Sequence, residues 1–273
     1  MAKMTEQEKN RILPFSKGRK MLAEASRQSK RYGHIKGILE VDVTKPVEIM
    51  NMYRERTGER LSFTSWVIKC VAQAVSDYRV VQTFRLGRNR MIEFYDVDIK
   101  TNVEKETKDG MKIPIQYLVR KAQEKSFKEI HDEIRAAQKY KEEKRKDERK
   151  IKRQQNLIMS LPVLLRKIFW HNIMTNPHKV KKHLGTIGVT ALGMFGQGLS
   201  GYALPNTPHS TTFAIGAIVK KPIYIDGEFQ PRDILHLTLI FNHDVVDGGP
   251  AVRFSNHLSV LMKEAYALDE FIT

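Results

Sequence analysis

The chain has 273 residues, of which 41% are hydrophobic, and a formal net charge of +16 at pH 7. Its single cysteine, Cys70, excludes an intrachain disulfide, and the charged first residues lack the apolar core of a signal peptide. No run approaches the roughly 18 apolar residues of a transmembrane helix. We therefore expect one large domain in a reducing, cytoplasmic setting, with no membrane span.

The positive charge is concentrated in one part of the sequence. Between residues 149 and 225 there are 11 Lys and Arg and no Asp or Glu. A basic stretch of this kind indicates an anionic partner, such as a nucleic acid, a lipid headgroup or a phosphate-bearing ligand. Charge alone does not choose among these partners.

Helical and strand patterns alternate along the chain without internal repeats, which predicts a mixed α/β fold. For the helix predicted over 45–57, Thr44 is the expected N-cap and Gly58 follows its end. Cys70 falls on the apolar stripe of the next helix and is expected to be buried. Asp226-Gly227 marks a hairpin turn. Helices are predicted over 18–28, 45–57, from Ser62 or Thr64, from Ser126 and after Gly249-Pro250; strands are predicted over 38–43, 95–103 (with one wet face), 111–119, 185–189, 211–219 and, centrally, 234–241.

Two unusual segments interrupt this pattern. From Lys139 to Arg153, 13 of 15 residues are charged, which favours a solvated helix extension or arm over a nucleic-acid contact, since aromatic residues for base stacking are nearly absent. Leu157 to Trp170 is apolar but contains Arg166 and Lys167. We expect this segment to form a helix that covers the core, the alternative being a basic amphipathic helix on a membrane surface.

Several known binding and catalytic motifs are either absent or not supported by the residues around them. The run Gly196–Gly201 matches Gly-x-Gly-x-x-Gly, but prolines follow where a helix should open, so we expect a loop and no dinucleotide. His171, His178 and His183 have no cysteine or carboxylate nearby to complete a metal site. The chain contains neither a Gly-x-Ser-x-Gly elbow nor a Walker A loop, which removes the main support for a serine hydrolase or a P-loop NTPase.

The motif with the best context is His243-Asp244-Val245-Val246-Asp247-Gly248. A buried strand is predicted to run into the histidine, and a turn then leads into an amphipathic helix. Loops at strand ends hold catalytic side chains on a rigid scaffold, and the imidazole of histidine can accept a proton near neutral pH. The motif therefore predicts a general base at His243.

The residues 243–254 resemble the active-site signature of the acyltransferase component of 2-oxo acid dehydrogenase complexes, and of its relative chloramphenicol acetyltransferase. The resemblance extends in order over most of residues 11–273, and it implies a chloramphenicol acetyltransferase-like mixed β-sheet with flanking helices. The other matching segments are 15–20, 39–44, 112–115 and 185–193.

The resemblance implies a mechanism and an assembly. His243 would act as general base on the thiol of coenzyme A or of dihydrolipoamide, and Thr190 would donate a hydrogen bond to the oxyanion. Asp247 would hold the loop through a salt bridge to Arg19, although it is alternatively a simple turn carboxylate, and Gly248 would support the same turn. The family forms its site between the subunits of a trimer, so a homotrimer or a multiple of trimers is expected.

The sequence also departs from the family. Asn242 and Asp244 stand where an aspartate and an arginine are usual, and residues 139–182 form a charged insertion without an aligned counterpart. We expect residues 1–273 to be a single catalytic domain without a lipoyl attachment site or a subunit-binding domain, so that any lipoyl-bearing protein would act in trans. The alternatives are a non-catalytic trimeric scaffold and a binder of anionic surfaces through the insertion; nucleic-acid binding as the main function is not expected.

Overall fold

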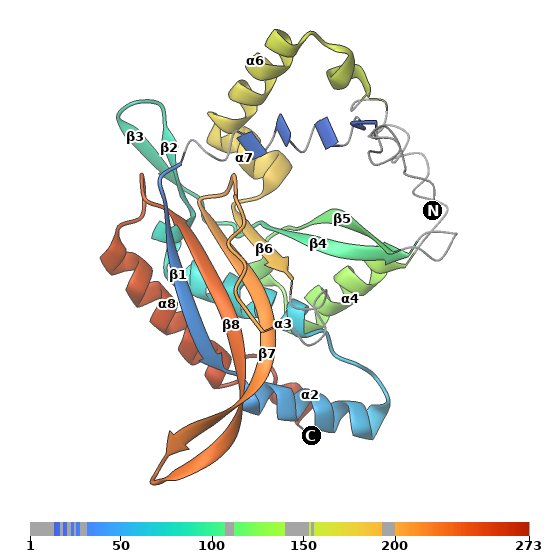
Figure 1. Cartoon of the computed structure of the whole chain (residues 1–273), viewed down its shortest axis with the longest axis vertical. Coiled ribbons are helices and arrows are strands. Elements are labelled where there is room, and N and C mark those ends of the chain that lie inside the picture. Colours follow the sequence, from blue (N-terminus) through green and yellow to red (C-terminus); the bar gives the residue numbers. More distant parts are fainter. Residues whose placement is uncertain are drawn as a thin grey trace, which may run out of the picture.

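The computed structural model of the chain describes residues 14–16, 19–20, 23–24, 26–27, 32–106, 112–139, 153, 156–192 and 200–272. Its centre is a six-stranded mixed sheet in the order β1-β8-β7-β6-β4-β5, beside a separate two-stranded hairpin of β2 and β3 (Figure 1). The strands are β1 (His34–Asp42), β2 (Thr83–Leu86), β3 (Arg90–Glu93), β4 (Ile99–Glu106), β5 (Lys112–Val119), β6 (Ile187–Ala191), β7 (Thr211–Ile225) and β8 (Glu228–Asn242).

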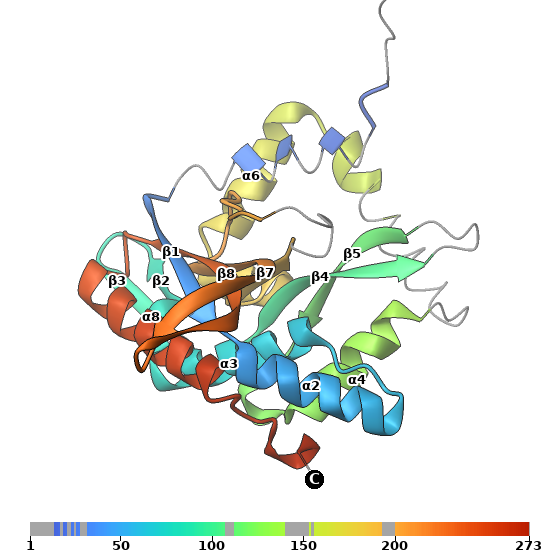
Figure 2. The same ribbon diagram turned by 60° about the horizontal axis from the view of Figure 1, so that its bottom comes forward.

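The helices α2 (Thr44–Thr57), α3 (Phe63–Asp77), α4 (Phe127–Gln138) and α8 (Gly248–Lys263) lie on one face of this sheet (Figures 1 and 2). The largest fully buried side chain, Trp66, lies among them and donates its indole N–H to the backbone oxygen of Tyr266 at 2.9 Å. Two further helices, α6 and α7, lie apart from this layer, at the opposite end of the molecule from α2. These two helices are α6 (Val163–Met174) and α7 (Pro177–Leu184), and short 3-10 turns lie at Arg79–Gln82, Ala122–Glu124 and Asp269–Phe271.

Several predictions that depend on local sequence are confirmed. Ser62 caps α3, and Ser126 caps α4 in a capping box with Glu129, which satisfies backbone N–H groups that a helix start leaves free. Cys70 is fully buried. The predicted strand 234–241 is the buried half of β8, which pairs with β1 on one side and with β7 on the other.

Other predictions need correction. Thr44 is the first residue of α2 rather than its N-cap; its hydroxyl instead donates to a carboxylate oxygen of Asp42 at 2.6 Å. The strand expected over 95–103 begins only at Ile99, and its supposed wet face includes the buried Asp98, which pairs with Arg120 at 2.8 Å. The last helix begins at Gly248, and the hairpin of β2 and β3 was not predicted. Most of the charged segment 139–153, and part of the helix expected over 18–28, lie outside the described residues.

The largest correction concerns the apolar segment before α7. A helix does form there, but it does not cover the core, because Met174 is the one residue of α6 that is buried. Leu164 is 69% exposed and Ile168 is 56% exposed. The segment thus presents apolar side chains to solvent in the single chain.

Contacts around Asp98 fix the start of β6, the strand that carries Thr190. The backbone N–H of Thr186 donates to the Asp98 carbonyl at 2.8 Å, and the guanidinium of Arg120 donates both to the Asp98 carboxylate and to the last carbonyls of α7. Gly185 links α7 to β6 with φ 78° and ψ −175°, a conformation that is essentially restricted to glycine.

We expect Gly185→Ala to destabilise the protein by about 1–3 kcal/mol, since an L-residue is strained at this φ and ψ. An added Cβ would also lie 2.5 Å from the Asp98 carbonyl oxygen. The free energy of unfolding from denaturant titration measures the effect. Gly37→Ala is the matched control, because the Cβ position of Gly37 has no neighbour within 4 Å; equal stability of the two variants would contradict this account of the link.

Candidate active site

A tight turn at the end of β8 carries His243. The backbone N–H of His243 donates to the Gly33 carbonyl at 2.7 Å, just before β1, while Asn242 receives the N–H of Val246 at 3.0 Å. Asn242 and Val246 are 3% and 0% exposed, so the turn is anchored in the core at both ends. The His243 side chain, by contrast, is half exposed. The turn thus holds an accessible imidazole on a fixed backbone.

Asn242 and Asp244, the two residues that depart from the family signature, contact the turn and the start of β1. The Asn242 side-chain oxygen accepts the backbone N–H of Asp244 at 3.1 Å, which an aspartate would also do. Asp244 lies near the start of β1, where its charge counteracts the lowering of the His34 pKa that burial and Lys36 produce. Neither residue contacts the His243 ring through a recorded hydrogen bond or ion pair within the described part of the chain.

Asp247 is at the N-cap of α8 and follows His243 by four positions. Its carboxylate is 87% exposed and lies 3.9 Å from Nδ1 of His243, too far for a hydrogen bond. It accepts no capping hydrogen bond from α8, although the positive end of a helix dipole favours an anion there. The carboxylate is therefore available to a group from outside this chain.

The predicted partners of this turn are not gathered around it in the single chain. The structure records no ion pair between Arg19 and Asp247, both of which are described; the backbone N–H of Arg19 instead donates to Ser16 at 3.3 Å. The Cβ position of Gly248 has no neighbour within 4 Å. The roles of Arg19 and Gly248 therefore stay predictions.

Thr190 lies on β6, on the sheet face that points away from α2, α3, α4 and α8. Its neighbours Val189 and Ala191 are buried in the helix-covered core, so the alternation of a strand turns Thr190 to the other face. Its side chain is partly exposed there.

The strand register separates Thr190 from His243. Thr190 pairs with Ala214 of β7, and Ala214 pairs with Thr238 of β8, five residues before His243. At about 3.3 Å per residue along a strand and about 4.8 Å between strands, the two backbones are roughly 19 Å apart. One chain therefore does not bring the two residues together.

A buried polar cluster that the sequence did not predict lies between these two positions. Thr212 and Thr207 share a hydrogen bond, Thr207 bonds Nδ1 of His209 at 3.1 Å, and Nε2 of His209 donates to the Leu184 carbonyl at 2.9 Å. The ring lies so close above Gly188 that a Cβ there would be 2.8 Å from Nδ1. The sequence feature that could have indicated this cluster is the polar run 207–212, which leads into the buried part of β7.

This cluster positions the surroundings of the site. It holds the segment before β7 against β6, and Ser210 of that segment accepts the backbone N–H of Asn242 at 2.8 Å, next to His243. Burial lowers the pKa of His209 to about 4, with Lys100 contributing in the same direction, so this histidine is neutral in the folded protein.

No group of His, Cys, Asp and Glu that could hold a metal ion occurs in the part of the chain that the structure describes. A hollow of about 410 Å³ lies elsewhere, between the N-terminal segment and α6, and includes Glu24, Lys167 and His171 in its lining. It contains neither His243 nor Thr190.

Comparisons with known proteins show the family to which the chain belongs. The family model described as 2-oxoacid dehydrogenases acyltransferase (catalytic domain) matches residues 7–160 and 174–268. The chain belongs to this acyltransferase family.

The chain is similar to the lipoamide acyltransferase component of the branched-chain α-keto acid dehydrogenase complex of Bacillus subtilis, 24% identical over 92% of this chain and 52% of the relative. It is also similar to the acetyltransferase component of the pyruvate dehydrogenase complex of that organism, 26% identical over 90% of this chain and 48% of the relative. The chain spans about half the length of these relatives.

Solved structures of family members confirm the expected fold. A probable dihydrolipoamide acetyltransferase from Listeria monocytogenes matches with a TM-score of 0.67 at 22% identity, over 94% of this chain and 95% of the other. The cubic core of a pyruvate dehydrogenase complex matches with a TM-score of 0.69 at 17% identity, over 98% of both chains. The dihydrolipoamide acetyltransferase of Azotobacter vinelandii, for which roles of a serine, a histidine and an asparagine in catalysis were investigated, matches with a TM-score of 0.68 at 18% identity, over 98% of both.

The buried neutral His209 predicts a loss of stability in acid. Its folded pKa, about 4, is below the ordinary 6.5, so the unfolded chain takes up the proton first as pH falls. The contribution of neutral His209 to the free energy of unfolding is fully present above about pH 6.5 and is lost as the pH falls to about 4. For this one group the loss amounts to roughly 3 kcal/mol. Unfolding free energies measured across that window should fall less in His209→Gln than in wild type or in His178→Gln, a control on the exposed side of α7. Parallel pH profiles for all three would contradict the assignment.

Proposed function

We propose that the protein transfers an acyl group between coenzyme A and a thiol, hydroxyl or amine acceptor, with His243 as general base. The observation that supports this most is the turn after β8, which leaves a half-exposed imidazole on a backbone fixed to Gly33 and to the core. Membership of the acyltransferase family supports the reaction class.

The proton transfer follows from the position of His243. An unprotonated ring nitrogen takes the proton of the attacking thiol as its sulfur bonds to the thioester carbonyl carbon, which becomes tetrahedral. When the intermediate collapses, the bond to the leaving sulfur breaks and the imidazolium returns the proton to it. The same two steps serve a hydroxyl or an amine acceptor.

The oxyanion of that intermediate needs a donor aimed at it, and we assign this role to Thr190 of a neighbouring subunit. The separation of roughly 19 Å within one chain, calculated from strand spacing, supports a site shared between chains. The order of residues supports it as well. In the A. vinelandii enzyme a serine precedes the histidine and an asparagine follows it by four positions, and here Thr190, His243 and Asp247 stand in that order, Asp247 also four positions after His243.

The assembly that fits this site is a homotrimer or a multiple of trimers. The exposed Asp247 carboxylate and the open space around Gly248 are then where an adjoining chain, and Arg19 of the N-terminal segment, would close the site. A lipoyl domain supplied by another protein is one acceptor that suits a histidine base. A non-catalytic trimeric scaffold is the alternative, but it gives no reason for an accessible histidine on an anchored turn.

We expect His243→Ala to lower acyl transfer by about two to four orders of magnitude, because the general base is lost. The fold should persist, since alanine keeps the backbone N–H that binds Gly33. Turnover with acyl-coenzyme A and a panel of thiol, alcohol and amine acceptors, lipoylated domains included, measures the effect by mass spectrometry. His178→Ala serves as the control, and activity of His243→Ala within a few fold of wild type would show that His243 is not the base.

Thr190→Val should lower kcat by about a hundredfold or more with little change in KM, because an oxyanion donor acts on the transition state. Valine has nearly the shape of threonine without the hydroxyl, so packing on β6 is kept. Thr190→Ser, which keeps the hydroxyl, should retain most activity. A higher KM with unchanged kcat would instead place Thr190 in substrate binding.

A further inference from the structure

The helix α6 is the part of the chain that the family does not explain. The family model matches residues on both sides of 161–173 but not this segment. Four of its apolar side chains are exposed, and both views place α6 away from the helices that cover the sheet (Figures 1 and 2). We define the α6 patch as Val163, Leu164, Leu165 and Ile168 of this helix together with Leu157, which precedes it; each is between 48% and 69% exposed.

The surroundings of the α6 patch are cationic. Of the 11 Lys and Arg between residues 149 and 225, a stretch without Asp or Glu, Arg166 and Lys167 lie on α6 itself, whereas Lys181, Lys220 and Lys221 pair with acidic residues outside the stretch. Glu24 of the N-terminal segment does reach α6, but its charge is taken up by Arg166, whose guanidinium lies 2.9 Å from it with both side chains mostly buried. That ion pair fastens the N-terminal segment to α6. Lys167 and Arg27 beside it form no ion pair with any carboxylate that the structure describes.

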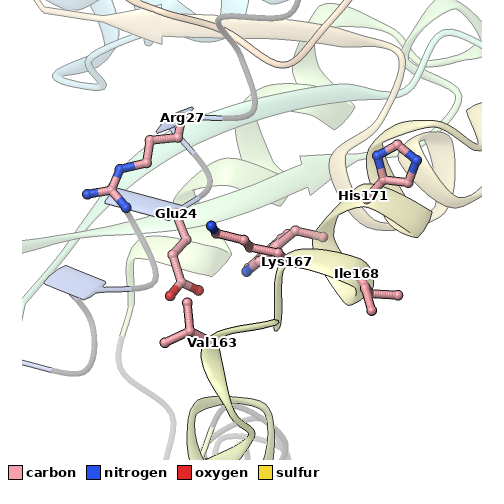
Figure 3. A pocket seen from close by; sticks show the side chains of 7 residues that line it. Glu24, Arg27, Val163, Lys167, Ile168 and His171 are labelled. Carbon is pink, nitrogen blue, oxygen red and sulfur yellow. The ribbon is translucent and has the colours of Figure 1, made fainter. Parts of the chain in front are cut away.

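The hollow of about 410 Å³ lies at this junction (Figure 3). Val163 and Ile168 of the α6 patch line it together with the cationic side chains of Arg27 and Lys167. Trp170 also lines it, and its indole N–H is buried without a hydrogen-bond acceptor among the described residues. Among the described residues, these two cations have no ion pair and this indole N–H has no acceptor, and apolar side chains lie next to them; such a site suits an anionic phosphate headgroup beside acyl chains.

We propose that α6 docks the protein on an anionic phospholipid surface, with the α6 patch in the interface and the headgroup phosphate in the hollow. A patch of apolar side chains with lysine and arginine around it binds such a surface by burial and by charge. A second copy of this chain is a poorer occupant, because it would bring two basic, acid-free stretches together. The described helices include none long and apolar enough to cross a membrane, so α6 lies on the surface. This inference does not depend on the acyl-transfer reaction.

Vesicle binding of the full-length protein tests the proposal. We expect cosedimentation with vesicles of equal parts phosphatidylcholine and phosphatidylglycerol, little with phosphatidylcholine alone, and release by salt. Leu164→Glu with Leu165→Glu should weaken binding at least tenfold, while Met52→Glu, which alters an exposed apolar residue of α2, should not. Lys167→Glu should weaken it about fivefold or more, in contrast to Arg54→Glu, which changes net charge equally on the exposed face of α2.

Tryptophan fluorescence gives a readout that needs no destabilising variant. Trp66 is fully buried in the core, so a blue shift on adding mixed vesicles should come from Trp170 and be absent in Trp170→Phe. Equal binding by all variants would mean unspecific charge attraction, and the same shift with inorganic phosphate alone would mean a small-anion site; either result overturns the proposal. It is also overturned if no vesicle binding occurs, or if the α6 variants fold but lose their oligomeric state in light scattering, which would make α6 an interface between copies.

Discussion

The pairing of β8 with β1 on one side and β7 on the other controls the rest of this structure. It places the end of β8 beside the start of β1, so that the backbone of His243 is held by Gly33. It also sets Thr190 two strands away and several residues back along the sheet. The strand order therefore leaves His243 accessible and separates it from Thr190, and we propose that the two residues act together in an assembly of chains.

The sequence predicted several features that depend on neighbouring residues. The capping box at Ser126 and the turn at Asp226-Gly227 have local causes, and the apolar run of β8 indicated a central strand before any pairing was known. The strand order has no such signal, because it joins segments far apart in sequence. The separation of Thr190 from His243 follows from that order and could be expected only through the family resemblance, while the His209 cluster depends on contacts across three elements.

For helix α6 the sequence predicted the helix correctly but its burial wrongly. Its composition favours burial against the core, and the structure instead leaves Leu164 and Ile168 exposed beside a hollow lined by Lys167. An apolar composition predicts that the side chains will be buried, but it does not tell whether the core of the same chain or an external partner buries them. The absence of acidic residues over 149–225 indicates an anionic partner, and we propose that this partner is a phospholipid surface.

The central claim is that His243 and Thr190 act together across two subunits. The most direct measurement unfolds His243→Ala and Thr190→Ala proteins together, reassembles them and assays acyl transfer. We expect the mixture to regain part of the wild-type activity although each variant alone is inactive, because some interfaces then pair an intact His243 with an intact Thr190. A mixture that stays inactive despite demonstrated exchange of subunits, or a wild-type monomer that is active on its own, would contradict it.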